Sequence, residues 1–458
     1  MLFIAIVQLT IAYSQEIVYQ KSFSGALTQA NKINKPVFIL LTLPAKTTPD
    51  SLLKFENFAS GFNSKSTANF YNKNFISYKV SLLDSDASKI RAKFHPAIFP
   101  AYIFLDTKGQ IVYRSGGNYA APEKYIYIAQ QALNRISSGN TITAFEQLSK
   151  EGKISREQLK NYITLKQEFE LFDNAELVDK YIGLLTINEQ DDYNQVLFIL
   201  KAGPYAFGKT YNLVHTNSKI IDSIYKREPE GLRKQINDHI IINTRTEAIK
   251  TKSITMAQNT ASFVRSTWGK NYQEGNKNFS NEMLIYYREI KDTTNYYRQA
   301  SNYYDTYYLN ISADSAKKLQ ANTLDRIRES VRTNKPQAPI VLSGTDNRAT
   351  FSRVVASSQT SDVAATLNTA VWRFYELGTH NTTYLVKALI WCHRAIELQP
   401  TFAYYDTMAH LMYRLNFYDE AILNQQKAIE MAMNIPVLSQ KTRDYLKAEL
   451  DKIKERTL

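Results

Sequence analysis

The apolar run PVFILLTL, residues 36–43, most constrains what this chain can fold into. A strand with one solvated face alternates apolar and polar side chains, whereas a continuous apolar run is typical of a strand buried on both faces. Such a strand needs a covering layer on each side, and in α/β domains these layers are helices. The run therefore predicts an α/β domain in the N-terminal part of the chain.

The patterns around this run alternate between strand and helix from residue 15 to residue 137. Short apolar runs bounded by turn residues indicate the strands, and amphipathic stretches indicate the helices. We expect further strands at 75–83, 101–105 and 110–114, and helices at 50–58, 87–94 and 124–136. The sequence Asp-Thr-Lys-Gly between the last two strands predicts a hairpin turn.

The stretch KFHPAIFPAYIFLDTKGQIVYRSGG, residues 93–117, resembles the corresponding part of the thioredoxin fold. The resemblance covers roughly residues 15–137 and implies a cis peptide bond before Pro100, a conformation that is scarce outside such sites. It also implies a groove beside Pro100 that pairs with extended peptide. Candidate groove residues are Thr47, Thr48, Phe99 and Pro100.

The chain departs from that family where its redox pair would stand. The matching stretch, LPAKTTPD at residues 43–50, contains no cysteine, and the whole chain has one, Cys392. Thiol–disulfide exchange needs two sulfur atoms close together. We therefore expect a thioredoxin-like domain without redox activity, not an enzyme, and with no cofactor. Cys392 is expected to be a small packing residue.

Residues 138–335 read as successive helices. Two apparent capping boxes, Thr143 with Glu146 and Ser155 with Gln158, predict helix starts. The tyrosine-rich stretch 286–308 predicts one long helix, because one stripe recurs at helical spacing. The stripe consists of Tyr286, Ile290, Tyr297, Tyr304 and Tyr308. A seam between helices is the expected role, and a face that binds a glycan or a protein is the alternative.

The C-terminal region contains an internal repeat of 33 residues. Ala388 and Ala395 recur as Ala421 and Ala428, in a pattern that resembles the tetratricopeptide repeat (TPR). Small residues in that family let paired helices approach closely. We expect a signal peptide at 1–14, a thioredoxin-like domain at 15–137, a helical domain at 138–335, an extended connector at 336–360 and TPR-like helices at 361–458.

The decapeptide KAGPYAFGKT, residues 201–210, fits the spacing of a nucleotide-binding P-loop. In that loop, backbone N–H groups and a lysine bind the phosphates after a strand of a parallel sheet. Here Pro204 lacks an N–H group, and the surrounding sequence predicts helices instead of a sheet. We therefore expect a turn between helices that binds no nucleotide, and a nucleotide hydrolase remains a third functional alternative.

The N-terminal sequence MLFIAIVQLTIAYS has the short apolar core and small residues of a secretory signal peptide. The apolar run is too short to span a bilayer, so it predicts export. The arrangement of the whole chain resembles secreted proteins of Gram-negative bacteria, which implies passage across the inner membrane and a periplasmic location. The net charge of +13 is spread along helices, and no motif indicates nucleic-acid binding. The six histidines include His393 and His410, close together in the repeat pattern, but their spacing predicts no metal site.

These features predict a non-catalytic interaction protein of the cell envelope that binds a protein or peptide partner. The alternative is an accessory factor in envelope thiol-redox or protein-folding maintenance that depends on the cysteines of its partner. The single cysteine, Cys392, separates both hypotheses from an intrinsic oxidoreductase.

Overall fold

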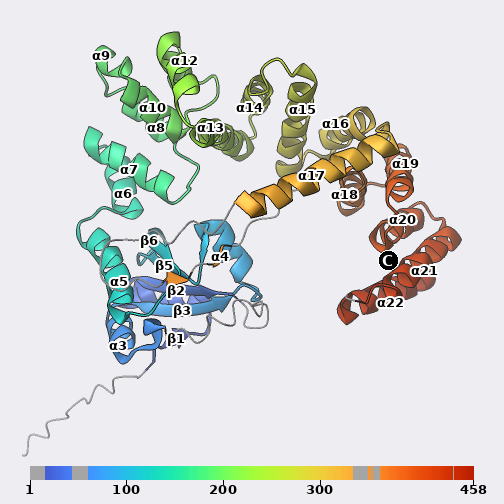
Figure 1. The fold of residues 1–458 in the computed structure, drawn as a ribbon, viewed down its shortest axis with the longest axis horizontal. Coiled ribbons are helices and arrows are strands. Elements are labelled where there is room, and N and C mark those ends of the chain that lie inside the picture. Colours follow the sequence, from blue (N-terminus) through green and yellow to red (C-terminus); the bar gives the residue numbers. More distant parts are fainter. Residues whose placement is uncertain (1–15, 44–59, 334–348, 351, 354–361, 437) are drawn as a thin grey trace, which may run out of the picture. The chain divides into compact units, whose positions relative to one another are not determined.

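The computed structural model of the chain describes residues 16–43, 60–333, 349–350, 352–353, 362–436 and 438–458 (Figure 1). The chain forms two compact units. Unit 1 contains residues 1–243 and 336–356, and unit 2 contains residues 244–335 and 357–458. Residues 1–15, which include the expected signal peptide, lie outside the described residues.

Unit 1 is built on a five-stranded mixed sheet. In spatial order its strands are β1 (Tyr19–Gln20), β3 (Ile76–Ser81), β2 (Val37–Thr42), β5 (Ala101–Leu105) and β6 (Ile111–Gly116). The first three are parallel, and β5 runs antiparallel to both β2 and β6. The α/β prediction is confirmed at this level. Strand β5 has its predicted bounds, whereas the short strand β1 was not predicted.

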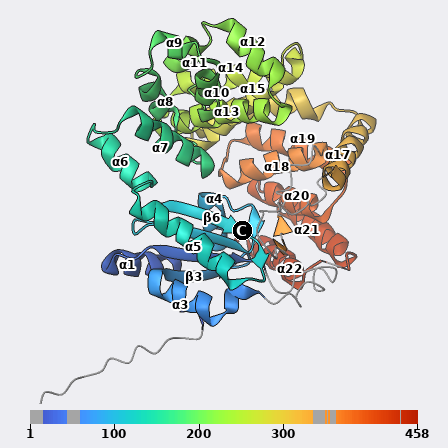
Figure 2. The same ribbon diagram turned by 60° about the vertical axis from the view of Figure 1, so that its left-hand side comes forward.

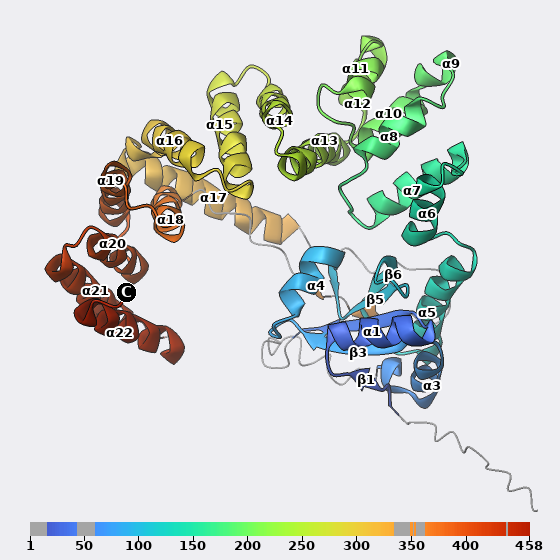
Figure 3. The same ribbon diagram turned by 180° about the vertical axis from the view of Figure 1, so that it is seen from behind.

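Helices cover both faces of this sheet. One face carries α1 (Phe23–Ile33) and α4 (Ala87–Phe94), whose Phe23 and Phe94 rings lie 6.4 Å apart. The other face carries η2 (Gly61–Asn63), α3 (Lys65–Asn74) and α5 (Pro122–Ser137). Figure 2 shows α5 across one face, and Figure 3 shows α1 across the opposite face.

The two-sided burial of β2 explains its continuous apolar sequence. Phe38 and Leu40 pack in the core beneath α3 and α5, where the Phe38 ring lies 4.7 Å from the ring of Tyr71. Ile39 and Leu41 alternate with them and therefore point to the other face. All four side chains are buried. The predicted helix at 50–58 lies outside the described residues.

Unit 1 continues as a series of short helices. They are α6 (Ile142–Lys150), α7 (Arg156–Glu168), α8 (Ala175–Ile182), α9 (Ile187–Gln190), α10 (Tyr193–Ala202), α11 (Lys209–Val214) and α12 (Ser218–Arg227). Helix α13 (Glu230–Thr251) contains the boundary between the two units.

The two predicted capping boxes have different outcomes. Ser155 and Gln158 form theirs at the start of α7, as predicted. The prediction for Thr143 is wrong, because Thr141 is the residue that caps α6, accepting a hydrogen bond from the Ala144 N–H at 3.2 Å. Thr143 lies inside the helix, and its hydroxyl donates to the Asp106 carboxylate in the hairpin turn. The Thr143 side chain, which the local pattern predicted to be a cap, therefore makes a tertiary contact instead.

Unit 2 is helical throughout its described residues apart from turns and bends. Its elements are α14 (Ile254–Ser266), α15 (Tyr272–Glu289), α16 (Thr293–Tyr304), the π-helical turn η3 (Asp305–Leu309), α17 (Ala313–Thr333), α18 (Val363–Glu376), α19 (Thr382–Leu398), α20 (Phe402–Arg414), α21 (Tyr418–Met433) and α22 (Gln440–Glu455). The four repeat alanines are fully buried in α19 and α21. Close packing at these alanines agrees with the sequence pattern, but assignment to the TPR family stays a prediction.

The tyrosine-rich stretch is divided among α15, α16 and η3 and is not the single long helix predicted. Helix α15 ends at Glu289, Lys291 adopts a left-handed conformation with φ of 62°, and Asp292 caps α16. The Asp292 carboxylate accepts from the Asn295 N–H at 3.1 Å. The local stop and start signals around Lys291 and Asp292 therefore override the continuous aromatic spacing.

The expected connector contributes two short strands to unit 1, while its other residues lie outside the described ranges. Strands β8 (Ala349–Thr350) and β9 (Ser352–Arg353) pair antiparallel with β7 (Asn118–Tyr119) and β4 (Ile98–Phe99) respectively. An extended conformation was expected for this stretch, but its pairing with the N-terminal unit was not.

Candidate functional site

The strongest candidate site is the edge formed by Ile98, Phe99 and Pro100, here called the Pro100 edge. The Phe99–Pro100 peptide bond is cis, as predicted from the resemblance. Phe99 is buried and anchors the edge in unit 1, whereas Ile98 is 38% exposed. The edge thus joins a fixed backbone to an accessible side chain.

Two consecutive glycines hold the Pro100 edge against the end of β6. The Gly117 N–H donates to the Pro100 carbonyl oxygen at 2.9 Å. A Cβ atom on Gly116 would lie 2.7 Å from the Ile98 carbonyl oxygen and 2.8 Å from the Ile98 Cβ. Because such distances are too short for a carbon atom, the position of β4 depends on a glycine at residue 116.

A tyrosine hydroxyl fixes the neighbouring strand β7. The Tyr125 hydroxyl, on α5, accepts from the Tyr119 N–H at 2.7 Å. It also lies 2.8 Å from the Asn118 side-chain oxygen and 3.0 Å from the Tyr119 carbonyl oxygen, either of which can accept its proton. The Tyr125 side chain is otherwise buried in the core of the sheet. Strand β7 is therefore held by the body of the domain.

The Pro100 edge and β7 pair with two short strands from one part of the chain, β9 and β8 respectively. Ile98 lies opposite Arg353 and Phe99 opposite Ser352. Asn118 and Tyr119 lie opposite Thr350 and Ala349. A strand edge with unpaired N–H and C=O groups is a template for another strand, and here the backbone of the chain itself fills that role.

The structure thus places Phe99 and Pro100 of the four predicted groove residues at this edge. Thr47 and Thr48 lie outside the described residues, so their position relative to Pro100 stays a prediction. Sequence reasoning did not identify Ile98, Gly116 or Tyr125. Gly116 and Gly117 were visible as a glycine pair after a strand, which is the one signal that pointed to a close backbone approach.

Cys392 lies in α19, far along the chain from this edge, and is fully buried. Its thiol contacts the Tyr404 carbonyl oxygen at 3.4 Å, and burial raises the pKa of the thiol to about 12. The packing role expected for Cys392 agrees with this environment.

We predict that Cys392 does not react with a thiol reagent in the native protein. The thiolate is the reactive species, and burial suppresses both its formation and its exposure. Labelling should be absent in buffer at mildly alkaline pH and reach one thiol per chain in denaturant, counted by mass spectrometry. Complete labelling under native conditions would contradict the burial of Cys392.

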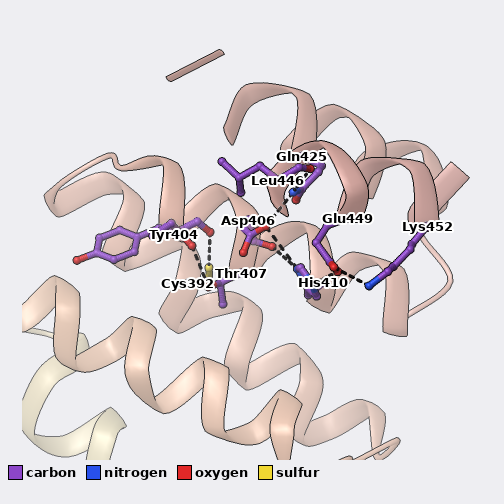
Figure 4. Close-up of polar contacts among 10 residues, drawn as sticks. Cys392, Tyr404, Asp406, Thr407, His410, Gln425, Leu446, Glu449 and Lys452 are labelled. Atoms are coloured by element: carbon purple, nitrogen blue, oxygen red, sulfur yellow. Dashed lines mark hydrogen bonds and ion pairs between the residues drawn. The ribbon is translucent and has the colours of Figure 1, made fainter. Parts of the chain in front are cut away.

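A second group of polar side chains is buried among α20, α21 and α22 (Figure 4). We call it the C-terminal polar cluster: Asp406, His410, Gln425 and Glu449, with the exposed Lys452 at its rim. The Gln425 amide donates to Asp406 at 2.8 Å and to the Leu446 carbonyl oxygen at 3.1 Å. Lys452 donates to Glu449 at 2.8 Å. These contacts connect the three helices.

His410 lies between two oxygen atoms of this cluster. Its Nδ1 lies 2.7 Å from the Asp406 carbonyl oxygen, which can only accept, so Nδ1 carries hydrogen. Its Nε2 lies 3.2 Å from a Glu449 carboxylate oxygen. One of these two atoms must carry a proton for the contact to be a hydrogen bond. Because His410 is 2% exposed, the arrangement suits helix packing better than chemistry on a substrate.

Stability should depend on pH through Asp406. Burial raises the pKa of Asp406, an effect that the nearby His410 partly offsets. A folded-state pKa above the unfolded value near 3.9 means that folding favours the protonated carboxyl, so its contribution is lost as pH rises through the folded pKa. Relative to Asp406→Asn, the wild-type chain should therefore lose stability as pH rises from about 4.

Thermal melts across pH can measure this difference. The exposed Asp451→Asn on α22 is the matched control and should parallel the wild type. Asp406→Asn retains an oxygen that can accept from Gln425, so loss of that hydrogen bond should not obscure the comparison. Parallel curves for the wild type and Asp406→Asn would refute the predicted linkage.

The P-loop-like decapeptide forms a turn between two helices, as expected. Val196–Leu200, the only candidate for a preceding strand, lies within α10, and α11 begins at Lys209. The Asn243 side-chain amide donates to the Gly203 carbonyl oxygen at 2.6 Å, and the Thr210 hydroxyl donates to Asp179. Thr210 is fully buried. These contacts give Gly203 and Thr210 a role in packing between helices. The absence of nucleotide binding stays a prediction.

The tyrosine stripe and the histidines offer no alternative site among the described residues. Tyr286, Tyr297 and Tyr304 are buried in hydrophobic cores, so the interpretation as a helix seam accounts for them better than a glycan-binding face. Within the part of the chain that the structure describes, no three His, Cys, Asp or Glu side chains are grouped to hold a metal ion. In the same residues, no helix combines the length and apolar character of a membrane span.

The chain matches no protein-family model and no curated protein. Among solved structures it is similar to one described as "DsbH Oxidoreductase", with 17% sequence identity and a TM-score of 0.22. The match covers 28% of this chain and 94% of that chain. At this identity and TM-score, the description of unit 1 rests on its own strand order and packing.

Proposed function

We propose that this chain is a non-catalytic interaction protein whose thioredoxin-like N-terminal domain binds extended peptide segments at the Pro100 edge. One observation carries the proposal: β4 pairs antiparallel with an extended segment that is remote in sequence. Addition of a strand to a sheet edge is a general mode of peptide recognition, because backbone hydrogen bonds supply affinity without a defined sequence. The partner is accordingly a protein with an accessible extended segment.

The proposal excludes intrinsic thiol–disulfide exchange. That reaction needs an attacking thiolate and a second sulfur, and Cys392 is the only cysteine in the chain. An insulin-reduction assay with dithiothreitol should therefore show no acceleration by the protein. The alternative, an accessory factor in envelope redox maintenance, differs in its partners. Such a factor would bind preferentially to proteins that contain cysteines.

The helical region is proposed to supply a second, TPR-like binding surface, and export to the periplasm is proposed from the apolar N-terminus. Supporting the first is the full burial of the repeat alanines in α19 and α21. Supporting the second is the composition of residues 1–14. N-terminal sequencing of protein from its native host should find a mature chain that starts near Gln15.

Selection of phage-displayed peptides on the full chain tests the peptide-binding proposal. The selected peptides should lose about tenfold or more in affinity for Gly116→Ala, since the added methyl group displaces Ile98. Gly231→Ala is the control, because its Cβ would meet open space. Circular dichroism verifies that both variants are folded. Peptides that bind Gly116→Ala and the wild type equally would argue against the Pro100 edge as their site.

A further inference from the structure

We infer that strands β8 and β9, together called the segment below, are a built-in ligand of the Pro100 edge and of β7, which a partner peptide must displace. This inference rests on the proposed function for the identity of the competitor. It adds that the chain itself occupies the peptide site. The apparent affinity for a free peptide is therefore set by competition with the segment.

The pairing pattern defines how the segment lies. It contacts two separate edges, β4 through Ser352 and Arg353 and β7 through Ala349 and Thr350. It runs antiparallel to both. Within the described residues, neither β4 nor β7 has another strand partner, and neither belongs to the five-stranded sheet. The segment thus pairs with two backbone edges that would otherwise be open.

Residues of the N-terminal domain hold β4 and β7 in place, whereas the segment comes from a distant part of the sequence. Gly116 and Gly117 position β4, and Tyr125 positions β7. The segment follows these edges by more than two hundred residues of sequence and lies between α17 and α18. Residues 336–356 belong to unit 1, while both flanking helices belong to unit 2. This is the arrangement of a receptor edge and a tethered ligand.

Tethering sets the expected size of the competition. A linked ligand acts at an effective concentration on the order of 1 mM. If the segment itself has a Kd of about 0.1 mM for the open edge, a free peptide would therefore bind the wild-type chain roughly tenfold more weakly than a chain with the edge vacated. The kind of partner also follows: an extended segment that runs antiparallel to both β4 and β7.

A disulfide trap tests whether the segment occupies the edge. Ile98→Cys with Arg353→Cys introduces thiols at directly opposed positions, where antiparallel Cα separations suit a disulfide. Oxidation should give an intramolecular bond. The control pair, Ile98→Cys with Thr350→Cys, is out of register, because Thr350 lies opposite Asn118. The buried Cys392 serves as the unreacted reference thiol.

Each outcome of the trap is decisive. A monomeric disulfide in the first pair and little in the control supports the inference. Disulfide-linked dimers would assign the segment to the edge of a second copy and overturn the tethered arrangement. Free thiols in both pairs would show that the segment does not occupy the edge, and would also overturn it.

A binding measurement then tests competition. The probe is a fluorescein-labelled peptide with the sequence of residues 346–356, DNRATFSRVVA. Thr350→Pro with Ser352→Pro should vacate the edge, since proline cannot donate to a strand pairing. This double variant should bind the probe about tenfold more tightly than the wild type. Thr350→Val with Ser352→Thr, which keeps strand propensity, should bind like the wild type.

The two proposals fail in different ways. Equal affinity for the wild type and the proline variant would overturn the built-in ligand while leaving a peptide-binding edge. Absence of binding to every chain, together with an intramolecular disulfide, would refute the proposed function and leave the occupied edge as a feature of the fold.

Discussion

Trp391→Ala is expected to destabilise unit 2 by about 3–5 kcal/mol, the largest effect of any substitution considered for that unit. The Trp391 side chain is fully buried, with its ring centroid 5.2 Å from that of Tyr304 and 5.1 Å from that of Phe374. Its Nε1 donates to the Asp305 carboxylate at 2.7 Å. Truncation would remove the packing and leave a cavity beside a carboxylate that has lost a donor.

Urea unfolding followed by far-ultraviolet circular dichroism can measure this effect. Trp268→Ala provides the matched control, because Trp268 is 42% exposed, and its truncation should change stability by about 0.5 kcal/mol or less. Trp391→Phe should fall between the two, since it keeps an aromatic ring but loses the Nε1 donor. A similar loss for Trp391→Ala and Trp268→Ala would contradict the core described for α16, α18 and α19.

Gly203→Ala is expected to destabilise unit 1 by about 2–4 kcal/mol, through overpacking and an unfavourable backbone conformation. Gly203 has φ of 76°, in the left-handed region that disfavours a side chain. An added Cβ would lie 2.5 Å from the Asn243 side-chain nitrogen and 2.7 Å from the His239 carbonyl oxygen. The glycine at the start of the P-loop-like pattern is therefore explained by helix packing.

Lys209→Ala separates this explanation from phosphate binding. Titration calorimetry with ATP or GTP and Mg²⁺ should give no binding heat for the wild type or for Lys209→Ala. In denaturant, Lys209→Ala should be close to the wild type, while Gly203→Ala unfolds at a lower concentration. Micromolar nucleotide binding that disappears in Lys209→Ala would reverse this interpretation of the turn.

The sheet of unit 1 could be predicted because its signals are local. The apolar run around Phe38 and the hairpin at Asp106 each specify a structure within a few residues. In the hairpin, Asp106 accepts from the Lys108 and Gln110 N–H groups at 2.9 Å, a pattern confined to the turn itself. Burial on both faces and turn chemistry are properties that a sequence window contains.

The errors arose where tertiary contacts or competing local signals decide. Thr143 fits a capping box, yet its hydroxyl binds Asp106, a residue 37 positions earlier in the chain. The tyrosine spacing around Lys291 suggested one helix, but the C-cap at Ile290 and the N-cap at Asp292 divide it. A periodic pattern reports which residues share a face and does not show whether the backbone is continuous.

The candidate site was only partly predictable, because its members are far apart in sequence. Phe99 and Pro100 were found through a family resemblance, whereas the pairing of Ile98 with Arg353 leaves no local pattern. The same holds for His410 and Glu449, which look like ordinary residues of charged helices but form a buried contact. Strand addition depends on backbone groups, which every residue has, so side-chain identity gives little warning of it.

Hydrogen–deuterium exchange at the Pro100 edge tests the central claim most directly. With Thr350→Pro and Ser352→Pro in place, peptic fragments that contain Ile98 and Phe99 should exchange faster than in the wild type, and adding the free 346–356 peptide should slow them again. Fragments from β1, an edge strand of the separate five-stranded sheet, should not change. Bound peptide that leaves exchange at Ile98 and Phe99 unaltered would contradict the account.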